Sequence, residues 1–298
     1  MDYATLDELR EQHLVETDWL AEHLYRPDIR IVDMRGYVKV LTDVDGFQAA
    51  EYLGARNDYE LGHIPGAMYL DWTTDLVDLI DPVPAQAAPP DKIAHVLGRV
   101  GIGSETLVIA YDSHPAMQFS TRLWWLLHYY GHTNVRVLNG GLKKWVDEGR
   151  DLSIDSVSVE PAQFLPVVVP ELHADADEVL NWISNPDVAL IDARDEGQYS
   201  GRIRRGPRGG HIPCATNLAR EEFIGADGLF LPAEQLHQIA VDRGLDPDKR
   251  IVAYCNGGVA ATSVLFVLSM LGFPQLTNYD GSWNEWTKRF EMPVESDV

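Results

Sequence analysis

The sequence predicts an α/β protein made of two copies of one domain, each a parallel sheet flanked by helices on both faces. Four phrases recur in the same order in the two halves of the chain, which is how a duplicated domain appears in a sequence. Within each half, short β-branched runs alternate with longer segments of helical spacing, as in strand–helix–strand units. The chain has 298 residues, of which 45% are hydrophobic and 23% charged, and this suits a soluble globular chain of one or two domains.

The repeated phrases define the domain organisation. The pairs, first copy and then second copy, are IRIVDMRG from Ile29 and VALIDARDE from Val188, GHIPGA from Gly62 and GHIPCA from Gly210, TLVIAYDSHPA from Thr106 and RIVAYCNGGVA from Arg250, LNGGLKKW from Leu138 and YDGSWNEW from Tyr279. We therefore expect a first domain over residues 1–150 and a second over 173–298. Residues 151–172 contain prolines and no helical period, so they predict a linker, and their apolar side chains predict that it packs against the domains.

The third pair of phrases contains a difference in chemistry between the copies. Residues 106–111 and 250–254 are predicted strands, and the segments 118–132 and 260–273 are predicted helices, each with a glycine near its end. The loop between strand and helix carries Cys255 in the second copy and Asp112 in the first. Ligands of open α/β sheets bind at such loops, beyond the carboxyl ends of the strands.

Cys255 is a candidate nucleophile. A loop that leads into a helix directs backbone N–H groups and the positive end of the helix dipole at its contents, which favours a thiolate. Gly257 and Gly258 allow the backbone to curl into an anion-binding nest, and the small side chains of Val259, Ala260 and Ala261 leave room for a ligand. The alternative is that Cys255 is a buried small hydrophobic residue, as free cysteines often are.

The duplicated GHIPGA and GHIPCA phrases, the cysteine loop and the closing YDGSWNEW resemble the two-domain rhodanese family over nearly the whole chain. The resemblance implies an enzyme that takes sulfur from 3-mercaptopyruvate or thiosulfate, holds it as a persulfide on Cys255, and passes it to cyanide or a thiol. A thiol-redox protein is one candidate for the thiol acceptor. It implies no metal or organic cofactor, a first domain without a catalytic cysteine, and Asp112 as a structural residue. Loop residues Asn256 to Ala260 would then bind the substrate.

The resemblance also assigns the anionic end of the donor to Arg194, for which a salt bridge at the strand end is the alternative. A cluster of arginines follows at Arg202, Arg204, Arg205 and Arg208. These arginines either supply positive charge near the pocket or form a solvated basic loop. We rank them below Arg194 as candidates for binding the donor. Asn256 stands where thiosulfate enzymes often carry arginine, and this neutral side chain favours 3-mercaptopyruvate, a monoanion at its carboxylate, over the thiosulfate dianion.

Composition excludes several other functions. The net charge of −22 argues against nucleic acid and against a membrane surface, and no run of 18 uncharged apolar residues predicts a membrane span. The N-terminal residues do not form a signal peptide, so we expect a cytoplasmic protein. The two cysteines are expected to be reduced, with Cys214 a packed thiol or, less favoured, a redox partner of Cys255. His63 and His211 lack a second ligand at zinc spacing and are expected to be structural.

Two functions remain as alternatives to sulfur transfer. A non-enzymatic carrier would hold a Cys255 persulfide that other proteins make and unload. A cysteine phosphatase would need an arginine at the sixth position after the cysteine to hold the oxyanion, and that position is Ala261.

Overall fold

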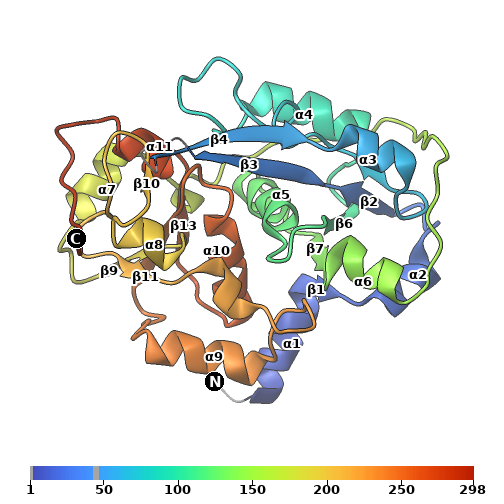
Figure 1. Ribbon diagram of the computed structural model, residues 1–298. Helices are drawn as coiled ribbons and strands as arrows, with labels where there is room; N and C mark the ends of the chain where they lie inside the picture. Colours follow the sequence, from blue (N-terminus) through green and yellow to red (C-terminus); the bar gives the residue numbers. More distant parts are fainter. Residues whose placement is uncertain (1–2, 43–46) are drawn as a thin grey trace.

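The computed structural model describes residues 3–42 and 47–298 and shows two α/β units side by side (Figure 1). The strands of the first sheet are β1 (Leu14–Val15), β2 (Ile29–Asp33), β5 (Met68–Tyr69), β6 (Leu107–Tyr111) and β7 (Val135–Leu138). Those of the second sheet are β8 (His173–Ala174), β9 (Val188–Asp192), β11 (Thr216–Asn217), β12 (Arg250–Tyr254) and β13 (Leu276–Tyr279). Both sheets are parallel throughout, and their orders, β5-β2-β6-β7-β1 and β11-β9-β12-β13-β8, match strand for strand. The predicted duplication and fold class are confirmed.

Helices cover both faces of each sheet. The first half contains α1 (Tyr3–His13), α2 (Thr17–His23), α3 (Arg56–Leu61), α4 (Pro90–Arg99), α5 (Gln118–Tyr129) and α6 (Gly141–Asp147). The second half contains α7 (Ala176–Trp182), α8 (Glu196–Tyr199), α9 (Ala233–Asp242), α10 (Ala261–Met270) and α11 (Ser282–Trp286), with 3₁₀ turns η1 (Pro170–Leu172) and η2 (Arg220–Phe223). None of the helices in residues 3–42 and 47–298 is long and apolar enough to cross a membrane.

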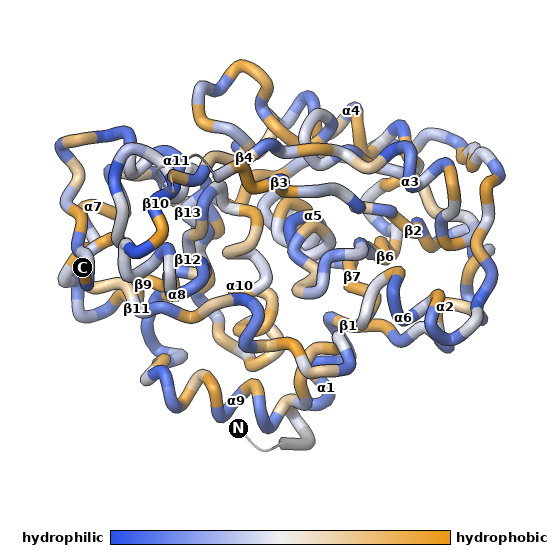
Figure 2. The backbone as a smooth tube through the Cα atoms, in the orientation of Figure 1, coloured by the Kyte–Doolittle hydropathy of each residue, from blue (hydrophilic) through white to orange (hydrophobic). Residues whose placement is uncertain are grey.

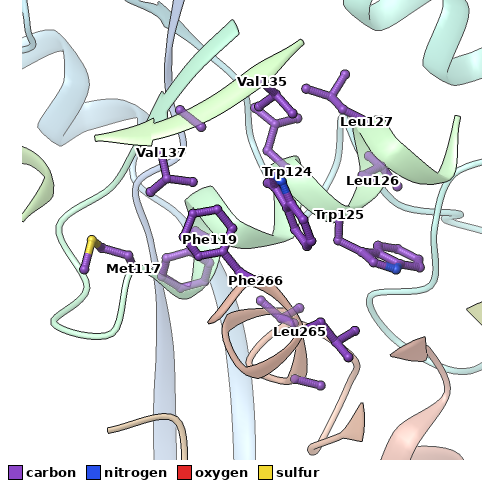
Figure 3. Packing of buried hydrophobic residues seen from close by; sticks show 14 of the residues in the cluster. Met117, Phe119, Trp124, Trp125, Leu126, Leu127, Val135, Val137, Leu265 and Phe266 are labelled. Carbon is purple, nitrogen blue, oxygen red and sulfur yellow. The ribbon is translucent and has the colours of Figure 1, made fainter. Parts of the chain in front are cut away.

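One hydrophobic core runs through both halves. Alternate residues of each central strand face opposite ways, so Val108 of β6 and Ile251 of β12 join a shared core, whereas Ile109 and Val252 join separate outer clusters. Helices α5 and α10, which follow the two equivalent loops, pack against each other inside this core (Figure 3). Residues Val264 to Leu268 of α10 are all apolar and fully buried, and Figure 2 shows the hydropathy along the whole backbone in the same view. The two loops are therefore held close together between the halves.

A third, small sheet joins the halves in a way that the sequence analysis did not predict. Strands β3 (Gly36–Thr42) and β4 (Phe47–Gly54) form an antiparallel hairpin in the first half. Strand β10 (Arg204–Arg205), from the arginine cluster of the second half, pairs with β4 in parallel. The hairpin therefore extends over the second half, as Figure 1 shows for the two long blue strands.

The segment between the domains packs down. Residues 151–169 form no helix or named strand, the Phe164 side chain is buried, and the Val167 N–H donates to the Tyr130 carbonyl at 3.0 Å. At the other end of the first half, α1 lies against α9 and α10, and the His13 imidazole lies 2.7 Å from the Ser269 hydroxyl. The domain bounds at 150 and 173 stay a prediction.

Candidate active site

Cys255 begins a six-residue loop, 255–260, between β12 and α10. Its own N–H and that of Gly258 both donate to the Ser282 hydroxyl, at 3.1 and 2.9 Å, which donates in turn to the Tyr279 carbonyl. The Gly258 N–H therefore does not face the sulfur, contrary to part of the predicted nest. The N–H groups of Asn256, Gly257, Val259 and Ala260 have no acceptor within the described part of the chain, and they are free to bind an anion.

Glycine is required at position 258. Its φ of +71° lies in the left-handed region, and a Cβ there would lie 2.5 Å from the Asp280 carboxylate. At Gly257 a Cβ would lie 3.0 Å from the Tyr52 hydroxyl, so the loop lies directly under the hairpin of the other half.

Cys255 lies at the wall of a pocket of about 440 Å³ between the two halves. The sulfur-bearing residue is only 3% exposed, so this pocket is its route to solvent. The predicted loop residues Asn256, Gly257, Val259 and Ala260 all line it. The first half contributes Val38, Val40, Gln48, Tyr52, Trp72, His114 and Gln118, and the second adds Asp195, Gln198, Arg205 and Arg220.

The positive charge of the pocket comes from Arg205 and Arg220. Arg205 is 8% exposed and no carboxylate within the described residues lies at ion-pair distance from it. A buried guanidinium without a counter-ion is costly unless an anion binds beside it. Arg220 pairs with Glu221 at 2.8 Å and leaves its Nε without a partner. The sequence analysis offered the cluster that contains Arg205 as one source of charge near the pocket without singling out Arg205, and it did not consider Arg220.

The rest of the arginine cluster lies elsewhere. Arg202 forms an exposed ion pair with Glu196, Arg204 is exposed, and Arg208 donates to four backbone carbonyls near the end of the chain. Only Arg205, in the middle of the cluster, reaches the cysteine pocket.

Arg194 is not among the residues that line the pocket, and the donor-binding role expected for it stays a prediction. The side chain is 1% exposed, and its Nε donates to both oxygens of Asp192 at 2.9 and 3.1 Å. A further bond reaches the Gly210 carbonyl at 2.7 Å, and the guanidinium lies 4.3 Å from the centre of the Trp283 ring. These contacts use its charge to hold the strand end to the GHIPCA turn.

The first copy repeats this arrangement. Arg35 is bonded to both oxygens of Asp33 at 3.1 and 2.9 Å and to the Gly62 carbonyl at 2.7 Å. Because the first copy has no cysteine, the shared geometry points to a structural role for the arginine in both.

Asn256 belongs to a short chain of amides at the pocket wall. Its side-chain N–H donates to the side-chain amide oxygen of Gln198 at 3.0 Å. The backbone and side-chain N–H groups of Gln198 donate in turn to the Asp195 carboxylate. The side-chain oxygen of Asn256 is buried without a partner. This places neutral donors and acceptors, rather than a cation, directly beside the cysteine.

In the first copy, Asp112 occupies the position equivalent to Cys255 and is fully buried. Its carboxylate accepts from the N–H groups of His114, Phe119 and Ser120 at 2.6, 3.0 and 2.7 Å, and from the Ser120 hydroxyl at 2.9 Å. Burial raises the pKa of Asp112 to about 6, against the lowering effect of these donors. The loop and the first turn of α5 thus hold an anion at the site where the second copy holds a thiol.

Cys214, expected to be packed, is exposed, with a positive φ of 65° and its sulfur 3.5 Å from the Ser184 hydroxyl. It is not among the pocket residues. His63 and His211 stack on Tyr59 and Tyr199 with ring centres 4.0 and 3.8 Å apart. Residues 3–42 and 47–298 contain no group of three or more His, Cys, Asp or Glu side chains that could hold a metal ion.

Comparison with known proteins agrees with this fold. The family model for the rhodanese-like domain matches twice, over residues 16–148 and 175–289. The sulfur carrier protein TtuD of Thermus thermophilus is 33% identical over 94% of this chain and 95% of its own length. The putative thiosulfate sulfurtransferase 1 of Mycobacterium bovis is 34% identical over 95% of this chain and 97% of its own.

A solved structure gives the same result. The crystal structure of SseA from Escherichia coli, described in its report as a 3-mercaptopyruvate sulfotransferase with the rhodanese fold, superposes with a TM-score of 0.78. It is 30% identical, and the match covers 91% of this chain and 98% of that one.

The duplicated fold and these relatives define a two-domain enzyme of the sulfurtransferase class. The chain belongs to the rhodanese-like domain family.

Proposed function

We propose that this enzyme moves sulfur from a small anionic donor, through a persulfide on Cys255, to a thiophilic acceptor such as cyanide or a thiol. One observation carries the proposal: Cys255 lines a cationic pocket at the N-terminus of α10, with unpaired loop N–H groups around it. The thiolate attacks the outer sulfur of the donor, the bond from that sulfur to the rest of the donor breaks, and the acceptor later removes the bound sulfur by a second displacement. Loop N–H groups and the helix dipole stabilise the anionic sulfur at both stages.

The anion held by Asp112 in the first copy supports this use of the loop. The same strand, loop and helix there surround a carboxylate with four donors. A thiolate or persulfide at Cys255 would receive the same kind of stabilisation from the second copy.

The proposal assigns the anionic end of the donor to Arg205, with Arg220 as a second cation, in place of Arg194. Arg205→Gln is expected to lower kcat/KM by about 30- to 150-fold, the effect of losing one charge-assisted contact at a desolvated site. Arg204→Gln, which changes the exposed neighbour, is the matched control and should leave kcat/KM unchanged. Equal rates for the two variants would refute the assignment.

Within the same proposal, 3-mercaptopyruvate is the better donor. Asn256 and Gln198 offer neutral hydrogen bonds to its carbonyl, and the Asp195 carboxylate in the pocket wall disfavours a dianion such as thiosulfate. A tenfold preference for thiosulfate in kcat/KM, measured with a common acceptor, would contradict this.

Cyanide-dependent formation of thiocyanate distinguishes a sulfurtransferase enzyme from a non-enzymatic persulfide carrier. Wild-type protein should turn over many times with a small donor, Cys255→Ser should not turn over, and Cys214→Ser should match wild type. Loading of Cys255 only by another protein, without turnover on either small donor, would favour the carrier function that the TtuD relative is named for. Hydrolysis of a phosphate monoester by the wild-type protein would favour the cysteine phosphatase hypothesis. A thiol-redox protein as acceptor and a cytoplasmic location stay predictions.

A further inference from the structure

The cysteine pocket contains a tyrosine that the sulfur-transfer chemistry described above does not use. Tyr52 comes from β4, in a hairpin that the first half inserts between its strand β2 and its GHIPGA turn. The second copy has only the arginine segment at this place. Residues 48, 50 and 52 of β4 alternate with more exposed neighbours, so Tyr52 faces inward, over the cysteine loop of the other half.

Two neighbours act on the oxygen of Tyr52. The Asn284 amide donates to it at 3.0 Å, and the positive charge of Arg205 favours its ionised form. The ring is held against Trp72, with ring centres 5.2 Å apart. The hydroxyl oxygen lies 3.0 Å from the position that a Cβ at Gly257 would take, two residues after the cysteine.

The hydroxyl proton of Tyr52 is not used in any hydrogen bond within the described residues. The oxygen accepts from Asn284, and no acceptor for its own proton is found within the described residues. Burial raises the pKa of Tyr52, with Arg205 and Asn284 acting in the opposite direction. The phenol is therefore protonated at neutral pH and presents an O–H donor to the pocket.

We propose that Tyr52 is the acid that protonates the leaving group when the donor is 3-mercaptopyruvate. The step rests on the proposed function. The Cys255 thiolate attacks the donor sulfur, and the pair of electrons from the broken sulfur–carbon bond passes to the organic fragment, giving the enolate of pyruvate. Tyr52 gives its proton to the enolate oxygen, the resulting enol becomes pyruvate in water, and solvent returns a proton to the phenolate. The hydrogen of the donor thiol stays with the persulfide.

Arg205 has a part in the same step. A cation whose charge acts on the phenol oxygen, as that of Arg205 does, stabilises the phenolate left after proton transfer. Because Arg205 also faces the donor in the proposed function, it would couple donor binding to acid catalysis.

Thiosulfate supplies the test, because its leaving group, sulfite, departs as an anion and requires no proton. Persulfide formation on Cys255 is measured in single turnover with each donor, in wild type and in Tyr52→Phe. With 3-mercaptopyruvate the rate constant should fall by about 100-fold or more, the usual contribution of a general acid. With thiosulfate it should change by less than about threefold, since binding and nucleophilic attack are kept.

Tyr37→Phe is the matched control, because Tyr37 is an exposed tyrosine of the same hairpin whose hydroxyl donates to Asp58. It should leave both rate constants unchanged. A solvent isotope effect in D₂O on the reaction with 3-mercaptopyruvate should be present in wild type and Tyr37→Phe and absent in Tyr52→Phe. This comparison needs no thiosulfate, so it replaces the two-donor test if wild type reacts poorly with thiosulfate.

Two results overturn the role of Tyr52 while the proposed function stands. An equal fall with both donors means that Tyr52 only shapes the pocket, and unchanged rates mean that another group supplies the proton. If neither donor puts sulfur on Cys255 of wild type, the proposed function fails and the role of Tyr52 fails with it.

Discussion

At the scale of one residue, Arg194 can be compared directly with its counterpart in the first copy, Arg35. Its guanidinium is buried and bonded to Asp192, as Arg35 is to Asp33. Removing one partner of a buried pair leaves an uncompensated charge and typically costs about 3–5 kcal/mol. We expect Arg194→Ala and Arg35→Ala to lower the free energy of unfolding by similar amounts, measured by urea denaturation.

The two variants control each other, since Arg35 belongs to the copy without a cysteine. An Arg194→Ala protein that unfolds like wild type but has lost sulfur transfer would restore the donor-binding role. A large loss of stability in both would establish the structural one.

The position of the cysteine loop could be predicted from the sequence, and most of the pocket around it could not. The duplication pointed to Cys255 because the two copies differ there, at a loop whose position follows from strand and helix periodicity. The same comparison favours a structural role for Arg194, because the phrases IVDMR and LIDAR both contain the pair Asp-x-Arg. Arg205 could not be singled out among four neighbouring arginines. The direction of its side chain is set by the pairing of β10 with β4, which the sequence does not reveal.

At the scale of the element, the strand–loop–helix unit of the first copy surrounds a carboxylate with donors, and we propose that the unit of the second copy holds an anion in the same way. In the first copy its occupant is Asp112, whose pKa is raised to about 6 by burial. A carboxyl with a raised pKa binds its proton more tightly in the folded state, so its contribution to stability is largest at low pH. That contribution falls as the pH rises from about 4 to about 6, by about 3 kcal/mol for a shift of roughly two units.

Asp112→Asn removes this titration. The free energy of unfolding of wild type, minus that of Asp112→Asn, should therefore decrease between pH 4 and pH 6 and stay constant above pH 6. Chemical denaturation at several pH values measures it. A difference that instead grows with pH would mean that the four donors dominate and hold the pKa of Asp112 below its usual value.

The hairpin is the element that the sequence analysis missed. Its inward face supplies Val38, Val40, Gln48 and Tyr52 to the pocket, yet it contains no motif repeated in the second half. Its pairing with β10 joins residues more than 150 positions apart, and such contacts depend on how the domains dock rather than on local pattern.

At the scale of the whole molecule, a buried ion pair ties the first half to the cysteine loop. Arg122 of α5 bonds to Asp280 at 2.5 Å and to the carbonyl of Gly258 at 3.2 Å, and both Arg122 and Asp280 are almost fully buried. We expect Arg122→Met to cost about 3–5 kcal/mol of unfolding free energy and to lower kcat in the molecules that remain folded, because Gly258 loses a fixed partner.

Lys143→Met is the control, since it breaks an exposed ion pair with Asp147 on the surface of α6, where such pairs contribute little. It should change neither stability nor kcat appreciably. An Arg122→Met protein with wild-type stability would show that this ion pair contributes little to holding the halves together.

The central claim is that Cys255, and not Cys214, carries the sulfur between the two halves of the molecule. Mass spectrometry of wild-type protein after treatment with 3-mercaptopyruvate, and again after addition of cyanide, tests it directly. The account predicts one added sulfur atom on the peptide that contains Cys255, lost on addition of cyanide, and none on the peptide that contains Cys214. An added sulfur on the exposed Cys214, with sulfur transfer surviving in Cys255→Ser, would contradict it.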